Sequence, residues 1–225
     1  MPTLPSNRIQ PLNDRPINPD GRFVLYWMQQ SQRHCDNHAL EHAVHEANFL
    51  EKPLVVGFGL TADYPDANAR HYAFMLDGLA DTFCGLRKRG IDVCLRLGNP
   101  ADVAGELAKN AALAVCDRGY LRHQREWRRK FAKSANCRVL QVESDAVVPV
   151  ESASDKVEYA ARTIRPKLMS QYEHFLTAPT LEKLENSAQL PLETGEDIAD
   201  LANLTKKLKL DTSVGPVSMF PSGPT

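Results

Sequence analysis

The sequence predicts an α/β fold of the Rossmann-like, doubly wound class, with a five-stranded parallel sheet and helices on both faces. Short β-branched apolar runs alternate with helical patterns, which is typical of βαβ units. The runs are almost continuously apolar, as in parallel strands buried on both faces. Of the 15 prolines, five lie in residues 1–20 and five from Pro179 onward. We therefore expect an N-terminal arm over 1–20, an α/β domain over 21–178 and a linker over 179–225.

Composition excludes several classes of protein. With 225 residues, 43% of them hydrophobic and 24% charged, the chain can bury a core, which excludes extensive disorder. The longest apolar run, residues 23–28, is far shorter than the roughly 20 residues that span a bilayer, so we expect no membrane association. A net charge of −1 gives no global attraction to nucleic acid. Without a signal-peptide pattern or CxxC pair, we expect a cytoplasmic protein with reduced thiols.

Five segments carry the strand pattern. They span residues 23–29, 53–58, 92–97, 113–117 and 138–142. In doubly wound sheets ligands bind beyond the carboxyl ends of the strands, so a site is expected in the segments that follow them. Those segments are residues 29–36, 59–68, 98–102 and 117–122.

Two helices between these strands have clear boundaries. From Asn68 to Gly90 apolar residues recur at helical spacing, with basic residues in the last turn and glycine after it. Asn99 before Pro100 predicts an N-cap followed by a proline in the first turn, and this helix should reach Ala111.

The pattern changes after residue 142. An extended segment over 147–150 leads to a helix from about Asp155, which Pro166 should break or kink, and a further helical stretch reaches Leu176. The acidic tail from Thr180 to Thr225 predicts a linker with one weak helix.

The segment His38-Ala-Leu-Glu41-His42 matches the HxxEH pattern, in which two histidines one turn apart hold zinc. A helical wheel places His38, His42 and His45 on one face and the apolar residues on the opposite one. We therefore expect a solvated polar face here rather than a metal site, and we assign no metal-binding residue.

The segment Gly57-Phe-Gly59-Leu-Thr-Ala62 fits the GxGxxA dinucleotide fingerprint. That site requires a helix that begins inside the motif, so that its first amides meet the pyrophosphate. Residues 63–68 delay the helix, which favours a strand that ends in flexible glycines over a nicotinamide site.

Residues 118–133 contain seven basic side chains and one acidic one. On a helix, four of the basic residues form a stripe, namely Arg122, Arg125, Arg129 and Lys133. Such a stripe can dock phosphates, but more often it is a solvated face. We favour the second interpretation, with the three arginines positioning the loop after Asp117.

Several blocks of the chain, in order, resemble the photolyase and cryptochrome family. The opening block, YWMQQSQR over 26–33 followed by DNHAL over 36–40, is similar to that of the class II cyclobutane pyrimidine dimer photolyases. Further blocks are NARHYAFML over 68–76, DRGYLR over 117–122 with Gln124, Arg125 and Trp127, QVE over 141–143 and EYAARTIRPK over 158–167. Together they cover most of residues 21–176.

The resemblance implies the N-terminal α/β antenna domain of a deoxyribodipyrimidine photolyase, a carbon–carbon lyase that repairs UV-induced pyrimidine dimers in DNA with blue light. In the family, FAD and the lesion pocket lie in a following helical domain, which these residues do not contain. That domain and UV-damaged DNA are therefore the implied partners. The fragment alone should fold but neither retain FAD nor repair DNA, so we assign no catalytic residue. An uncovered apolar interface would favour weak self-association.

The resemblance also implies that the α/β domain holds a light-harvesting chromophore, either a deazaflavin or a folate. The parallel-sheet rule and the amides after the first strand place this pigment over the strand ends. The predicted binding residues are Met28, Gln29, Gln30, Gln32, Phe58, Gly59, Leu60, Asp117 and Gly119.

The alternative is a free-standing Rossmann-like module that binds a nucleotide or flavin, or senses light, without repair activity. A coding sequence that continues past Thr225 into helical, tryptophan-rich sequence would favour the photolyase, and a native stop there would favour the module.

Overall fold

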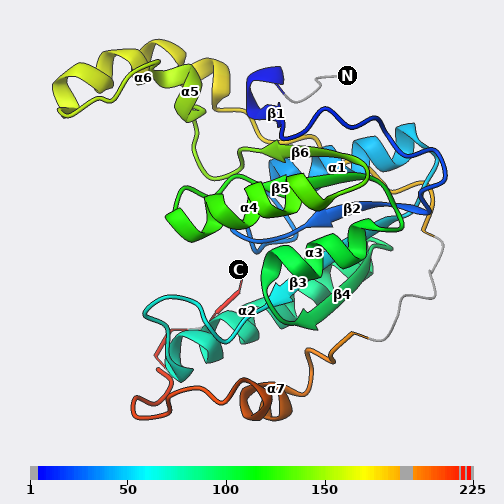
Figure 1. Ribbon diagram of the computed structural model, residues 1–225. Helices are drawn as coiled ribbons and strands as arrows, with labels where there is room; N and C mark the ends of the chain where they lie inside the picture. The colour runs from blue at the N-terminus through cyan, green and yellow to red at the C-terminus, as the bar shows by residue number, and fades with distance from the viewer. Residues whose placement is uncertain (1–4, 188–194, 218, 221, 224–225) are drawn as a thin grey trace.

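The computed structural model describes residues 5–187, 195–217, 219–220 and 222–223. At its centre lies a sheet with the strand order β1-β6-β5-β2-β3-β4 (Figure 1). The last five strands in this order are parallel, which confirms the predicted α/β class. They are β2 (Phe23–Trp27), β3 (Leu54–Leu60), β4 (Asp92–Leu97), β5 (Ala111–Asp117) and β6 (Arg138–Val142).

The prediction of five strands was one too few. A short strand from the arm, β1 (Ile9–Pro11), pairs antiparallel with β6 and makes the sheet six-stranded and mixed. A three-residue strand that ends in proline carries no sequence pattern of its own, and proline is tolerated there because β1 is an edge. Before it, the 3₁₀ helix η1 (Ser6–Arg8) brings Arg8 into the interior at 2% exposure. Its guanidinium donates hydrogen bonds to the carbonyls of Glu143 and Phe175, among others.

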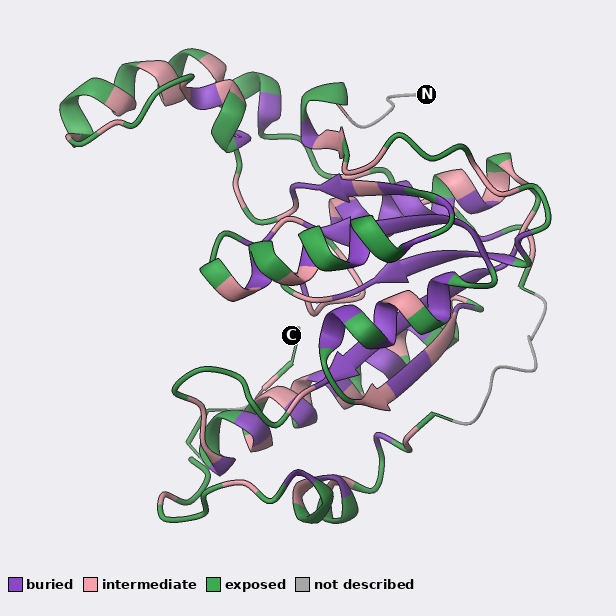
Figure 2. Ribbon diagram, in the orientation of Figure 1, coloured by how far each residue is buried: buried purple, intermediate pink, exposed green. Residues whose placement is uncertain are grey.

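Helices cover both faces of the sheet, as predicted. One face packs against α1 (His38–Phe49) and α2 (Ala69–Lys88). The other packs against α3 (Pro100–Ala108) and α4 (Arg122–Ser134). Figure 2 shows the buried sheet between these two layers. The near-continuous apolar strands therefore face two separate hydrophobic cores.

Asparagine begins three of these helices. The side-chain oxygens of Asn37, Asn68 and Asn99 accept hydrogen bonds from first-turn amides, which would otherwise lack partners. The helix α2 ends before Gly90, whose φ of 74° suits glycine. The helix α3 ends three residues before the predicted Ala111, because Ala111 already belongs to β5.

Beyond β6 the helix boundaries differ from the prediction. A short helix α5 (Val150–Ala153) forms first, and α6 (Ala161–Phe175) begins six residues after the predicted start at Asp155. The helix α6 continues through Pro166, so the expected break does not occur. Pro166 lies in the second turn, where its missing amide costs one hydrogen bond near a helix start. The pair α5 and α6 projects from the body in Figure 1.

The tail packs on the α2 side of the domain. The predicted weak helix is α7 (Leu201–Leu208). Leu184, Ile198, Leu204 and Leu208 are all buried in the core that α2 shares with the sheet. This packing was not expected from a linker, because these four apolar residues are widely spaced in a polar sequence.

The histidine face of α1 is solvated only in part: His45 is exposed as predicted and His38 is half-buried, whereas His42 is buried. Glu41 is 5% exposed and forms a two-pronged ion pair with Arg89 at 2.7 and 2.8 Å. His42 is 9% exposed, and its Nε2 has no hydrogen-bond partner among the described residues. The segment after α6, residues 177–182, lines a cavity with this face. A helical wheel cannot include a segment that arrives from about 140 residues later.

Burial of His42 predicts a pH-dependent stability. Burial lowers the pKa of His42 to about 4, below its ordinary value near 6.5. Between these values the unfolded chain binds the proton more readily than the folded one, so stability falls as pH decreases through this window. The free energy of unfolding of the unchanged chain should fall between pH 6.5 and 4.5. We expect it to fall by about 2 kcal/mol less in the His42→Gln variant. Urea denaturation at several pH values measures this.

The same substitution at the exposed His71 is the control for loss of an imidazole. Equal pH slopes for the His42→Gln and His71→Gln variants would contradict the assignment.

Candidate functional site

A cavity of about 440 Å³ opens at the carboxyl ends of β2 and β3, and we call it the first cavity. Doubly wound sheets bind ligands at this edge, and the volume lies in the range of small-molecule sites. Seven of the nine residues predicted for the site line it, namely Met28, Gln29, Gln30, Gln32, Phe58, Gly59 and Leu60. The structure therefore brings the two predicted strand ends together around one space.

Asp117 does not line the first cavity but holds its wall in place. One carboxylate oxygen accepts hydrogen bonds from the backbone amides of Gln29, Gln30 and Ser31 at 2.8, 2.9 and 3.1 Å. The other accepts from the Tyr26 hydroxyl at 2.7 Å. Burial raises the pKa of Asp117, and these four hydrogen bonds oppose that rise. The end of β5 thus fixes the loop after β2.

Gly119, the ninth predicted residue, lines a different cavity. The residues after Asp117 run toward α5. There Arg118 pairs with Glu151, and the Tyr120 hydroxyl bonds to Glu143. The rule that ligands bind beyond the carboxyl ends of parallel strands placed the loop after β5 at the correct edge of the sheet. It could not show which of the two cavities Gly119 lines.

Aromatic side chains from the loop after β3, from α2 and from α4 line the first cavity. Tyr64, in the loop after β3, packs edge-on against His123 and Trp127 at centroid distances of 4.8 and 6.2 Å. Tyr64 and Trp127 both line the cavity, as does Tyr72 of α2. The Tyr72 hydroxyl donates to the Thr61 carbonyl at 2.6 Å, which anchors this loop. These rings provide edges and faces that suit a planar ligand.

Sequence reasoning missed the contribution of α4. Gln124 lines the first cavity and donates to the side-chain oxygen of Gln30 at 2.5 Å. Its own oxygen accepts from the Leu121 amide at 3.2 Å, which helps to begin α4. Gln124 and Trp127 both stand in the family-like block of the sequence, and that resemblance was the signal that could have identified them.

The Gln29 amide is the polar group that most clearly lacks a partner at this site. Both its Nε2 and Oε1 are buried without a hydrogen bond among the described residues. A buried polar atom without a partner costs roughly 1–3 kcal/mol, so a donor and an acceptor side by side favour a ligand that satisfies both. A planar heterocycle with adjacent carbonyl and N–H groups has this complement, and the residues present fit such a group.

A family model described as DNA photolyase matches residues 24–186, which is most of the chain. The chain belongs to the DNA photolyase family. The match includes both strand ends that form the first cavity, together with α4.

Photolyase relatives from several organisms are similar over most of this chain. The deoxyribodipyrimidine photo-lyase of Methanothermobacter thermautotrophicus is 44% identical over 195 residues, which cover 87% of this chain and 44% of the relative. The photo-lyase of Potorous tridactylus is 37% identical over 165 residues, covering 72% of this chain and 31% of the relative. The chain thus spans less than half the length of these curated photolyases.

Solved photolyase structures share the fold. An archaeal photolyase from Sulfolobus tokodaii, described with two FAD molecules that imply a novel light-harvesting cofactor, aligns with a TM-score of 0.68 at 14% identity. The alignment covers 89% of this chain and 44% of that one. A class III photolyase from Agrobacterium tumefaciens aligns at 0.61 with 16% identity, over 80% of this chain and 38% of that one.

In this photolyase-family chain the GxGxxA segment has a packing role. Gly57 and Gly59 lie inside β3, and α2 begins only at Ala69. A Cβ on Gly59 would lie 2.7 Å from the Cα of Pro100, so glycine allows α3 to approach the sheet. The interpretation as flexible glycines at a strand end was therefore wrong, since both glycines are extended and covered by α3.

The three arginines that were expected to position the loop after Asp117 do not hold it with their side chains. Arg122, Arg125 and Arg129 are exposed, and none makes a hydrogen bond to that loop among the described residues. Gln124, which accepts from the Leu121 amide, and Glu143, which bonds to the Tyr120 hydroxyl, position this loop instead. Among the residues that the structure describes, no helix is long and apolar enough to cross a membrane. No three His, Cys, Asp or Glu side chains there gather as metal ligands would.

Proposed function

We propose that residues 21–178 form the antenna domain of a class II cyclobutane pyrimidine dimer photolyase, with 1–20 as an arm and 179–225 as the linker toward a helical FAD domain. The opening block YWMQQSQR supports the class II assignment. The first cavity would hold a deazaflavin or a folate. When bound, such a pigment absorbs light and passes the excitation energy to FAD in the longer enzyme.

The unpartnered Gln29 amide carries this proposal. Its donor and acceptor would bind the polar edge of the heterocycle, while Tyr64 and Trp127 flank the ring system. Asp117 supports Gln29 and Gln30 from beneath by fixing their backbone amides. The side chains of this domain thus bind and orient the pigment and exclude water from it.

The longer enzyme would be a lyase that repairs UV-induced dimers in DNA with blue light, through an FAD held outside these residues. The names and lengths of the curated photo-lyases support this proposal. Exposed apolar side chains such as Val157 and Tyr159, at 85% and 93% exposure, offer a surface to the helical domain or to weak self-association.

We expect the 225-residue chain to bind 8-hydroxy-5-deazaflavin or methenyltetrahydrofolate but to leave dimers in an illuminated oligonucleotide unrepaired. Gln29→Leu should weaken pigment binding about tenfold, because one donor and one acceptor lose their partners. Fluorescence titration measures the affinity. Gln171→Leu, the same change on α6 outside the first cavity, is the control.

Tight pigment binding that Gln29→Leu leaves unchanged would refute the proposed site. Light-dependent loss of dimers in the presence of the chain alone would refute the assignment of repair to a further domain.

A further inference from the structure

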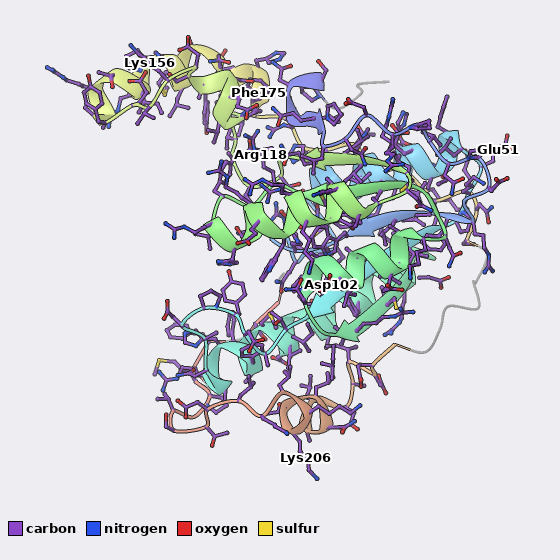
Figure 3. All side chains as sticks on the ribbon, in the orientation of Figure 1. Glu51, Asp102, Arg118, Lys156, Phe175 and Lys206 are labelled. Carbon is purple, nitrogen blue, oxygen red and sulfur yellow. The ribbon has the colours of Figure 1, made fainter. Side chains whose placement is uncertain are left out.

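A second cavity, of about 670 Å³, lies between α4, the loop after β5, α5 and the arm. Its walls are strongly basic, although the chain as a whole carries a net charge of −1. The basic side chains are Arg118, Arg125, Arg128, Arg129 and Lys133. Among the described residues of this wall, Glu151 is the single acidic one. Arg118, labelled in Figure 3, lies on the α5 side of this space.

Carboxylates neutralise only one of these cations. Arg118 forms ion pairs with Glu151 at 2.5 Å and with Glu143 at 3.6 Å. None of the other four forms an ion pair among the described residues. On the opposite side of α4, by contrast, Lys130 pairs with Asp102 at 2.7 Å. The unpaired cations of α4 are therefore concentrated on the side that faces the second cavity.

Arg128 carries the argument for a ligand, because it is buried and has no carboxylate partner among the described residues. It is 7% exposed. Its Nε donates to the Gln141 side-chain oxygen at 3.1 Å, and one terminal nitrogen donates to the Gln124 carbonyl at 3.5 Å. A guanidinium has five N–H donors, and no described residue accepts from the remaining ones. A buried cation without a counter-ion is costly, so its retention favours an anionic ligand.

The neighbouring positive charges strengthen this inference. Burial lowers the pKa of Arg128, and the positive charges of Arg118 and Arg125 lower it further, while Cys116 and Asp117 act in the opposite direction. Like charges that line one cavity repel one another, and a polyanion among them would turn that repulsion into attraction. Arginines suit phosphate oxygens in particular, because their planar fork can donate two parallel hydrogen bonds.

The same cavity offers an aromatic surface. Tyr120 is 44% exposed, and its hydroxyl is fixed by Glu143. The Arg118 guanidinium lies 5.4 Å from the ring centroid. A ring held in this way can pack against a planar base, while the arginines of α4 remain available for phosphates.

We propose that the second cavity binds a nucleoside polyphosphate, with Arg125, Arg128, Arg129 and Lys133 on the phosphates and Tyr120 against the base. A small ligand is favoured over a DNA duplex because Arg128 is reached only by a group that enters the cavity. The site is separate from the first cavity and does not depend on the pigment proposal.

The proposal is tested by calorimetric titration of the 225-residue chain with ATP, inorganic pyrophosphate and a 12-base-pair duplex DNA. ATP and pyrophosphate should bind, and both should raise the melting temperature, since a ligand that binds only the folded state stabilises it. The double variant Arg125→Ala/Arg129→Ala should weaken both about 10- to 100-fold. Tyr120→Ala should weaken ATP at least threefold more than pyrophosphate.

Two variants of α4 outside the second cavity are matched controls for loss of positive charge. Arg122→Ala and Lys130→Ala should each change the affinity for ATP less than twofold. Because Arg125 and Arg129 are exposed, their substitution should leave the fold intact, and far-UV circular dichroism checks this.

Three results would overturn the proposal. One is the absence of ATP and pyrophosphate binding at millimolar concentration. Another is an equal loss of affinity in the Arg122→Ala or Lys130→Ala control. The third is duplex DNA binding that exceeds ATP binding and weakens with every arginine removed from α4, which would indicate an exposed patch for the DNA backbone.

Discussion

Replacing Asp117 by alanine is expected to lower the free energy of unfolding by about 3–5 kcal/mol and to abolish pigment binding at the first cavity. The carboxylate is 1% exposed and is the sole described acceptor for three consecutive amides and the Tyr26 hydroxyl. Its removal leaves four donors without a partner, two of them buried and two part-buried. The loop that carries Gln29 and Gln30 then loses its fixed conformation. Urea denaturation and pigment titration measure the two effects.

Asp117→Asn separates the role of geometry from that of charge. An asparagine keeps one oxygen for the three amides, and the Tyr26 hydroxyl can accept from its NH₂ group. We expect this variant to lose only about 1–2 kcal/mol and to retain weakened pigment binding. Equal effects of asparagine and alanine would show that the negative charge, rather than the hydrogen bonds to the loop, is what the site requires.

Gly59→Ala is expected to cost about 2–4 kcal/mol of stability and to distort the first cavity. Its new Cβ would lie 2.7 Å from the Pro100 Cα and 3.2 Å from the Val103 Cβ. Both atoms belong to the start of α3, so the helix must move away from the sheet. Pro100 and Gly59 both line the first cavity, which changes shape with them. Thermal and urea denaturation, together with pigment titration, measure the effect.

Gly57→Ala is the matched control on the same strand. Its Cβ would meet the Leu107 Cδ1 at 2.6 Å, but this atom is the end of a side chain that can change rotamer. We expect a cost of about 1 kcal/mol and normal pigment binding. If Gly57→Ala proved the more damaging of the two, close approach of the α3 backbone would not be the reason for these glycines.

The central strands could be predicted because each is buried on both faces and therefore apolar throughout. The helices α2 and α3 were predictable from their own asparagine caps. Features fixed by distant contacts were not predictable. The strand β1 exists because β6 offers it a free edge, and Leu204 is buried because α2 lies beneath it.

The candidate site divides in the same way. The glutamines after β2 followed from the position of strand ends in a parallel sheet. Tyr64 and Trp127 come from a loop and a helix about 60 residues apart, and only their packing reveals them as one wall. The second cavity was hidden for a related reason. A helical-wheel projection of α4 shows the basic stripe, but it cannot show that the arm and α5 lie opposite this stripe and close the second cavity.

The pairing of β1 with β6 has a consequence for synthesis of the chain. Ile9 lies opposite Val142, so the arm leaves the ribosome roughly 130 residues before its partner strand exists. At the usual 5–20 residues per second, the arm waits on the order of ten seconds or more without its register neighbour. Arg8 must wait longer, because one of its acceptors is the Phe175 carbonyl. Closure of this sheet edge is therefore a late event in folding, and until β6 emerges the arm remains an unpaired strand.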